Sequence, residues 1–514
     1  MNAQASAGAG KVPHRGIITI CVMLATIMQA LDTTIANVAL PYMQGSLSAT
    51  YDQINWVLTS YIVAAAIMTP PTGWLASRFG RKRLFLVAVA GFVVTSVLCG
   101  AATTLSEMVA FRFLQGVFGA PLVPLSQSVL LDSYPREQHG SAMAMWGVGV
   151  MLGPILGPTL GGYLTDVYNW RWVFYINLFV GVATFIGLST FLTETTKDKS
   201  NGFDWFGFTT LSVAIGALQM MLDRGERLDW FSSTEIIVET TLCVLAFYLF
   251  LVHMATAKRP FITPSIFKDR NFVAGLIFIF IIGIVLLATM ALLTPFLQTL
   301  MNYPVLTAGI VLSPRGVGTM IAMLIAGRII QRVDPRLLIL SGLILTAVSL
   351  WEMVGFTPDV SEWAIIRSGL IQGLGLGFSF VALTTITFAT LTPELRTQGT
   401  ALFSLMRNIG SSIGISVVIF LLNRNTQIVH SGLVEHVTRF SDLARNPSLA
   451  PLWNPGTVQG LASLDVEMTR QASAIAYVND FKLMMILTLA SILLLPLLKR
   501  PASQAGAPAH VAVE

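Results

Sequence analysis

Apolar segments of about 20 residues follow one another along almost the whole chain, with short polar loops between them. At 1.5 Å per residue, each segment can cross the roughly 30 Å hydrocarbon core of a bilayer as a helix. A chain of 514 residues with 54% hydrophobic and only 11% charged residues cannot hide such segments in a soluble globule. The sequence therefore predicts an all-α polytopic membrane protein.

Roughly fourteen segments meet this length criterion. Because helix ends are poorly marked in sequence, their boundaries are soft by two to four residues. The expected spans are 17–40, 54–74, 84–103, 107–131, 140–164, 172–192, 206–222, 236–255, 273–296, 307–330, 336–354, 363–391, 399–422 and 481–498.

Basic residues lie mostly in the loops on the side of the N-terminus, whereas the opposite short loops hold only Arg171, Arg224 and Arg227. The positive-inside rule then places both termini in the cytoplasm of a multi-pass protein of the bacterial inner membrane. The net charge of +5 reflects this orientation, so no nucleic-acid partner is implied. The three cysteines lie in apolar spans without ligand spacing, so neither a disulfide framework nor a metal site is expected.

A weak internal repeat divides the chain. The basic loop at Arg78 resembles the one at Arg332, and FLQG around Gln115 resembles LIQG around Gln372, with offsets of 254 and 257 residues. Two related halves are the simplest cause, and such transporters place their substrate path between the halves. We expect a cytoplasmic leader at 1–16, a six-helix half at 17–192, two extra helices with linkers at 193–260, a second six-helix half at 261–422 and 481–498, a long periplasmic loop at 423–480 and a cytoplasmic tail at 499–514.

The long polar segment 423–480 is unusual, because loops of that length in a compact protein are functional or disordered. Two faint helical patterns, at 427–439 and 458–477, favour partial order. We therefore expect a docking surface for a partner protein there.

The fifth expected span carries glycines at every fourth position, with prolines between them, and we call this row the glycine ridge. Interior prolines and glycines would break this helix in water, but in a bilayer small residues let a neighbouring helix pack closely. We expect the ridge to seal the first half against a helix of the second half, with plain packing as the alternative. Its residues are Gly149, Gly153, Pro154, Gly157, Pro158, Gly161 and Gly162.

Asp32 lies near the middle of the first span, where an ionisable residue usually marks an ion or proton route. Arg112 enters from the outer end of the fourth span and can reach Asp32 by snorkelling. Protonation of Asp32 would then loosen this tie and couple inward proton flow to outward substrate movement; the alternative is a static buried pair. Glu352, near the outer end of its span, is an interfacial residue first and a second coupling carboxylate only second.

The loop 73–83 combines turn-forming glycines with clustered positive charge. Gly73 and Gly80 permit tight turns and close helix approach, while Arg78, Arg81 and Lys82 can pair with helix C-termini or acidic side chains. The loop is therefore a candidate gate, and anchoring by the positive-inside rule alone is the alternative. Polar residues that could line a substrate cavity are Gln29, Asn37, Gln115, Gln127 and Arg407.

Five motifs in order resemble those of the fourteen-helix drug:proton antiporters (EmrB/QacA-type) of the major facilitator superfamily, nearest to the EmrB-type multidrug exporters of Gram-negative bacteria. They are LDTTIANVALP (31–41), GWLASRFGRKR (73–83), RFLQG (112–116), GVMLGPILGPTLGG (149–162) and WRWVFYIN (170–177). The resemblance implies a major facilitator fold, a coupling or packing role for Asp32 and a proton-transfer role for Arg112. Ser77 departs from the family, where an aspartate is usual, so the charge relay of this loop must be weaker or rebuilt through serine hydrogen bonds.

The motif set favours proton-driven export of hydrophobic toxic compounds by alternating access, with the proton gradient as energy source and no cofactor. The EmrB-type resemblance further implies a tripartite system with a periplasmic adaptor (a membrane fusion protein) and an outer-membrane channel. A transporter of a specific metabolite or siderophore would share the fold, but the glycine-proline helix argues against it. A membrane enzyme or scaffold is the least favoured class, because the six histidines form no cluster with carboxylates.

Overall fold

The computed structural model describes residues 14–195, 197, 202–258, 260–436 and 457–499, and these form helices joined by short loops, without strands. The first half contains α1 (Arg15–Ser46), α2 (Tyr51–Ile54), α3 (Trp56–Met68), α4 (Thr72–Phe79), α5 (Arg81–Ala101), α6 (Leu105–Gly119), α7 (Leu122–Ser133), α8 (His139–Val167) and α9 (Trp172–Phe191). After α10 (Trp205–Arg224) and α11 (Thr234–Thr256), the second half contains α12 (Arg270–Pro295), the π-helix η4 (Phe296–Leu300), α13 (Val305–Ile329), α14 (Pro335–Val354), α15 (Glu362–Phe388), α16 (Pro393–His436) and α18 (Val458–Ile492).

Thirteen helices of the described chain are long and apolar enough to cross a membrane, with α6 and α7 counted as one span. The remaining expected span, 54–74, is the shorter apolar helix α3, which a break at Thr69–Pro71 separates from α4. Two consecutive prolines explain the break, since each removes a backbone donor. The predicted all-α polytopic architecture is therefore confirmed.

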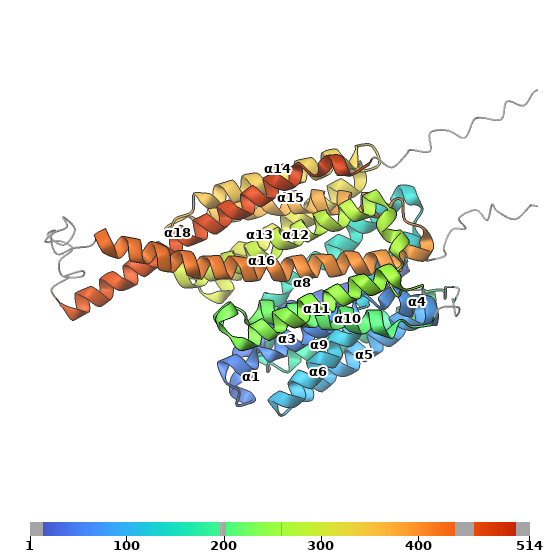
Figure 1. The fold of residues 1–514 in the computed structure, drawn as a ribbon, viewed down its shortest axis with the longest axis horizontal. Coiled ribbons are helices and arrows are strands. Elements are labelled where there is room, and N and C mark those ends of the chain that lie inside the picture. Colours follow the sequence, from blue (N-terminus) through green and yellow to red (C-terminus); the bar gives the residue numbers. More distant parts are fainter. Residues whose placement is uncertain (1–13, 196, 198–201, 259, 437–456, 500–514) are drawn as a thin grey trace, which may run out of the picture.

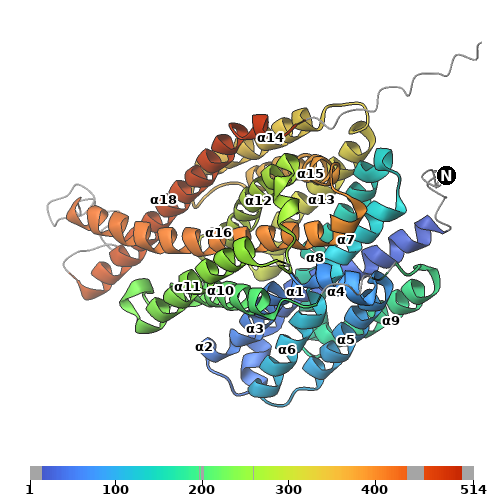
Figure 2. The same cartoon turned by 45° about the vertical axis from the view of Figure 1, so that its right-hand side comes forward.

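The two halves lie side by side, with the first half in blue and cyan and the second in yellow to red (Figure 1). Helix α10 packs against both α3 and α16, so the extra pair α10–α11 bridges the halves on one flank (Figure 2). We call the end of the bundle at which α1 begins, and where the loop 73–83 lies, the basic end, and the opposite end the distal end. This arrangement agrees with the expected insertion of two helices between the repeats.

Polar contacts between the two halves gather at the basic end in the described structure. The hydroxyl groups of Ser128 and Thr397 lie 2.8 Å apart. Ser141 donates to the carbonyl oxygen of Gly327 at 2.7 Å, joining α8 to α13. The halves are thus closed against each other at this end.

Two helices continue far beyond the others at the distal end and pack together there (Figures 1 and 2). Helix α16 has 44 residues and α18 has 35, which makes α16 about 66 Å long, roughly twice the hydrocarbon thickness. The expected long loop 423–480 therefore differs from the structure: 423–436 and 458–480 extend α16 and α18, in line with the faint helical patterns, and 437–456 lie outside the described residues. We call these two extensions the distal arm.

The glycine ridge on α8 faces α1, within the same half. A Cβ at Gly153 would lie 2.6 Å from the backbone carbon of Ala30, and one at Gly161 would lie 2.9 Å from Ile35. Gly157 packs in the same way against Thr34, whereas Gly162 has no neighbour within 4 Å. The predicted partner in the second half is therefore wrong.

Another face of α8 meets the second half instead. Besides Ser141, it packs Ala144 against Gly327 and Ile155 against Gly316, both on α13. The sequence could not separate these faces, because small residues occur on both. Pro154 and Pro158 lie on α8, but their side chains are outside the described part of the structure.

Candidate functional site

A buried polar cluster surrounds Asp32 in the first half. Its carboxylate is fully buried, and Arg112 on α6 is 1% exposed. Arg112 Nη1 lies 2.6 Å from Asp32 Oδ2. Gln115 Nε2 and Asn177 Nδ2 each donate to Asp32 Oδ1 at 2.9 Å. We call these four residues the Asp32 cluster.

A surrounding set of contacts fixes the arginine in place. Arg112 Nε donates to the carbonyl oxygen of Val57 at 3.1 Å, and Nη1 also donates to Gln115 Oε1 at 2.7 Å. The guanidinium carbon lies 4.4 Å from the centre of the Tyr61 ring, a cation–π contact. Arg112 thus has polar and aromatic partners besides Asp32, so it can stay in place while the charge on Asp32 changes.

The local sequence explains how these side chains meet. Arg112 and Gln115 are three residues apart on α6 and therefore share one face of that helix. Gly116 lets α6 approach the carbonyl oxygen of Tyr61 on α3, where any Cβ would clash. Asp32 is fully buried on α1, where its carboxylate faces α6 and α9.

The chemistry of the cluster depends on the charge of Asp32. Three donors, one of them cationic, converge on a carboxylate that water does not reach, so the ion pair and the hydrogen bonds act in a dry environment. Removing one partner of such a buried pair costs about 3–5 kcal/mol, since the other charge is left uncompensated. Adding a proton to Asp32 would remove its charge, and with it this attraction, without removing an atom.

Sequence reasoning found part of this cluster. The structure brings Asp32 and Arg112 together as expected, and it places Gln115 beside them rather than in a cavity wall. Asn177 was not singled out, although it ends the motif WRWVFYIN and its buried amide also binds Ser96 at 3.0 Å. A lone amide in an otherwise apolar stretch of α9 is the signal that could have found it.

The loop 73–83 forms a tight corner between α4 and α5. Gly80 has a φ of +92°, a conformation that favours glycine. The Glu194 carboxylate accepts hydrogen bonds from the backbone N–H groups of Lys82 and Arg83 at 3.1 and 3.2 Å, capping the N-terminus of α5. Lys82 Nζ donates to the carbonyl oxygen of Ser189 at 2.7 Å. These contacts fix the corner within the first half.

Asp132 on α7 joins the loop to the second half. It forms ion pairs with Arg81 on α5 and with Arg396 on α16, the latter at 2.5 Å. Arg81 also donates to the carbonyl oxygen of Pro393 at 3.3 Å. We call Arg81, Asp132 and Arg396 the basic-end latch.

The latch is built without Ser77, which donates to the carbonyl oxygen of Trp74 in its own helix at 2.8 Å. A relay rebuilt through serine hydrogen bonds is therefore not what the structure shows. Gly73 packs against Gln398, so its missing side chain brings α4 close to α16. Arg78 lies at the end of α4.

The expected cavity residues have separate surroundings. Gln29 donates to the hydroxyl of Tyr61 at 3.3 Å, and Asn37 is exposed and donates to the carbonyl oxygen of Thr33 at 3.4 Å. Gln127 is buried, and its Oε1 has no partner among the described residues. Arg407 is half-buried on α16.

Glu352 lies near the distal end of α14, 3.3 Å from Arg367. The side chain of Arg367 is 52% exposed, so the pair occupies an interfacial position. Nothing in this geometry resembles the dry Asp32 cluster.

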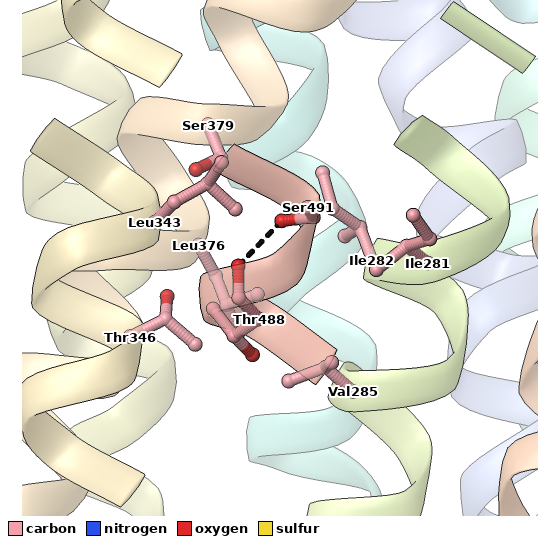
Figure 3. Close-up of a pocket in the computed structure, with 9 residues that line it drawn as sticks. All are labelled: Ile281, Ile282, Val285, Leu343, Thr346, Leu376, Ser379, Thr488 and Ser491. Atoms are coloured by element: carbon pink, nitrogen blue, oxygen red, sulfur yellow. Dashed lines mark hydrogen bonds between the residues drawn. The ribbon is translucent and has the colours of Figure 1, made fainter. Parts of the chain in front are cut away.

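Two of the cavities in the described structure differ in size and lining. A small one of about 10 Å³ lies between α12, α14, α15 and α18, with Thr346, Ser379 and Thr488 among its lining residues (Figure 3). This is room for about one water molecule. A cleft of about 810 Å³ lies between α3, α6 and α10 towards the distal end, and Trp56, Phe113 and Met220 contribute to its apolar lining. Its size suits a drug-like molecule or a lipid tail.

Across the described residues, no group of three or more His, Cys, Asp or Glu side chains could hold a metal ion.

Known proteins share both the sequence and the fold. The sequence profile of the Major Facilitator Superfamily matches residues 22–415. The chain is 38% identical over 431 residues to the multidrug export protein EmrB of Escherichia coli (strain K12), which covers 84% of each chain. It is also 38% identical over 425 residues to the fatty acid resistance protein FarB of Neisseria gonorrhoeae, covering 82% of this chain and 84% of FarB.

The fold also matches the crystal structure of the human organic anion transporter MFSD10 (TETRAN). The TM-score is 0.59 at 14% sequence identity, over 93% of this chain and 100% of that chain. At this identity the likeness bears on the fold alone. Taken with the sequence matches, it identifies a multi-pass membrane transporter rather than an enzyme, and the chain belongs to the Major Facilitator Superfamily.

Proposed function

We propose that this protein exports apolar, drug-like compounds across the bacterial inner membrane in exchange for protons. The observation that carries the proposal is the Asp32 cluster, a buried carboxylate whose partners all come from the same half. The relatives EmrB and FarB, one named for multidrug export and the other for fatty acid resistance, support export of apolar compounds. The basic end is the cytoplasmic side in this proposal, by the positive-inside rule.

Proton binding acts through α1. With Asp32 ionised, the ion pair with Arg112 holds α1 against α6. When Asp32 takes up a proton, this attraction weakens, while Arg112 keeps its contacts with Val57 and Gln115. Helix α1 is then free to shift relative to α6, and the glycine ridge transmits that shift to α8.

The basic-end latch holds the cytoplasmic side closed in this conformation. For substrate to enter from the cytoplasm, the contacts of Asp132 with Arg396 and of Ser128 with Thr397 must break. Alternating access therefore exchanges these contacts for others at the distal end. Ion pairs that remain partly exposed suit this role, because they contribute little net stability and open at low cost.

The distal arm is the docking surface for a periplasmic adaptor in this proposal, and an outer-membrane channel would complete the exit path. Its support is geometric: α16 and α18 continue beyond the length that the bilayer needs. Removing residues 424–470 and joining the two spans by a short flexible linker should reduce efflux from whole cells. Drug-driven proton release in everted vesicles should persist in this variant. If efflux from cells and proton release in vesicles fall equally, the distal arm is not a docking surface.

Everted membrane vesicles test the central proposal. Respiration acidifies their interior, and addition of an apolar fluorescent drug should release protons while the drug is taken up. Asp32→Asn should abolish both signals, whereas Asp32→Glu, which keeps an ionisable group, should retain part of them. Glu352→Gln is the matched control and should behave as wild type. Full drug-dependent proton release in Asp32→Asn would refute the proposed role of Asp32.

A further inference from the structure

The internal repeat places a second polar site opposite the Asp32 cluster. With the offset of 257 residues that aligns Gln115 with Gln372, the counterpart of Asp32 is Thr289 on α12. The structure repeats the contact: Gln372 Nε2 donates to Thr289 Oγ1 at 3.4 Å, as Gln115 Nε2 donates to Asp32. The second half thus keeps the amide and replaces the carboxylate by a hydroxyl.

The cation is also kept, although another helix supplies it. The counterpart of Arg112 is Gly369 on α15, where a Cβ would lie 3.7 Å from the Cβ of Arg315 on α13. Gly373, one turn further on, lets the backbone at Arg315 pack directly against α15. Helix α15 packs against both α12 and α13 in the second half (Figure 2). Arg315 therefore fills the space that the glycine leaves.

This second site lacks an anion. Arg315 is 6% exposed, and its Nη2 donates to the carbonyl oxygen of Leu286 at 2.9 Å, but Nη1 has no partner. Gln372 is fully buried, and its Oε1 also has no partner. None of the ion pairs among the described residues includes Arg315.

A second arginine, Arg407 on α16, has its backbone against the same stretch of α12. The carbonyl oxygen of Arg407 packs against Gly283, one turn of α12 away from the Leu286 carbonyl that Arg315 binds. Arg407 likewise forms no ion pair within the described structure. Uncompensated cations inside a membrane protein are costly, and they usually mark a ligand or ion site.

We infer that Arg315 and Gln372 form a subsite for the carboxylate of an apolar organic acid. The ligand carboxylate binds beside the Thr289 hydroxyl, where it accepts from Arg315 Nη1 and, after rotation of the amide, from Gln372 Nε2. The apolar part of the ligand lies between the halves. This inference rests on the proposed exporter function and names one class of its substrates.

Two probes of matched shape test the subsite: 2-naphthoate, which carries the carboxylate, and 2-naphthamide, which is neutral. Binding to the purified full-length protein in nanodiscs is measured first, because binding does not depend on transport or proton coupling. Wild type should bind the acid more tightly than the amide. Arg315→Gln should weaken binding of 2-naphthoate roughly 10- to 100-fold, since a hydrogen bond to a charged group is lost, and leave 2-naphthamide within about twofold.

Gln372→Glu is a second, independent variant. It places a carboxylate beside Arg315, at the position that Gln115 has in the first half, and should exclude 2-naphthoate while the protein stays folded. Arg367→Gln is the matched control, since it removes a guanidinium of the same half from the surface. An equal change for acid and amide in Arg315→Gln, or unchanged binding of 2-naphthoate in both subsite variants, would overturn the inference. Displacement of 2-naphthoate by equimolar chloride would also overturn it, because the site would then select small inorganic anions.

Transport separates this inference from the proposed function. If everted vesicles show no drug-driven proton release while 2-naphthoate binding depends on Arg315, the exporter proposal fails and the subsite stands. If proton release driven by a neutral drug is normal while Arg315→Gln leaves 2-naphthoate binding unchanged, the exporter stands and the subsite fails.

Discussion

Replacing Gly157 by leucine tests whether the contact between α8 and α1 carries the response to the proton. A Cβ at Gly157 would already lie 2.8 Å from the Cβ of Thr34 and closer still to its hydroxyl oxygen. That hydroxyl is held by the carbonyl oxygens of Ala30, Leu31 and Gly153 at 3.0–3.2 Å, so it has nowhere to turn. To make room for the Cβ alone, helix α1 must move away from α8 by roughly 1 Å, and the remaining atoms of the leucine side chain need a larger shift. Such overpacking lowers the stability of a protein by about 1–3 kcal/mol.

The displacement reaches the Asp32 cluster, because Thr34 is two residues from Asp32. Hydrogen bonds of 2.6–2.9 Å hold the carboxylate, and a shift of about 1 Å would take them beyond normal length. We expect Gly157→Leu to lower the rate of drug-driven proton release in everted vesicles roughly 10- to 100-fold. Membrane insertion, followed by the yield of folded protein in detergent, should change little.

Gly162→Leu is the matched control, since it makes the same substitution on the same helix where no atom lies within 4 Å. It should transport as wild type. Equal loss in the two variants would show that leucine disturbs α8 in general, and unchanged transport in Gly157→Leu would show that the ridge only packs.

Three further substitutions test other parts of the structure. Asn177→Leu removes one donor to Asp32 and should lower the rate of drug-driven proton release roughly 10- to 100-fold. A wild-type rate would contradict a role for Asn177. Asp132→Asn removes the charge that Arg396 pairs with across the halves. A cysteine introduced at the basic end should then react faster with a membrane-impermeant thiol reagent. An unchanged labelling rate would show that the latch does not hold the halves closed. Gly80→Ala places a Cβ on a residue with positive φ and brings it against Glu194. Thermal unfolding of the purified protein should show that the free energy of unfolding falls by about 1–3 kcal/mol. Wild-type stability would contradict the strain argument.

Features that depend on the order of residues along one helix could be predicted from the sequence. The spans follow from apolar length, and the pairing of Asp32 with Arg112 follows from their depth in the membrane and the cost of a lone buried charge. The repeat that aligns Gln115 with Gln372 was also visible, because both follow a short shared motif.

Features that depend on which faces of helices meet could not be predicted. Glycines at four-residue spacing mark a face for close packing, but they do not tell whether α1 or α13 covers it. Asp132 stands in a short polar stretch near other charged residues, so nothing in the sequence indicates that it pairs with Arg396, 264 residues away. The distal arm was expected as a loop, because its polar composition hid the continuation of two apolar helices into water.

In the proposed mechanism, the position of Asp32 on α1 explains how proton binding would move the two halves relative to each other. Successive residues of a helix turn by about 100°, so Asp32 points away from Ala30 and Thr34, which lie two residues to either side. One side of α1 therefore holds the proton site against α6 and α9, and the opposite side packs on the glycine ridge of α8. Helix α8 in turn contacts α13 through Ser141. On this proposal, a change in the attraction between α1 and α6 shifts α1 against α8, and the contact of Ser141 with Gly327 carries that shift to the second half at the end where the latch lies.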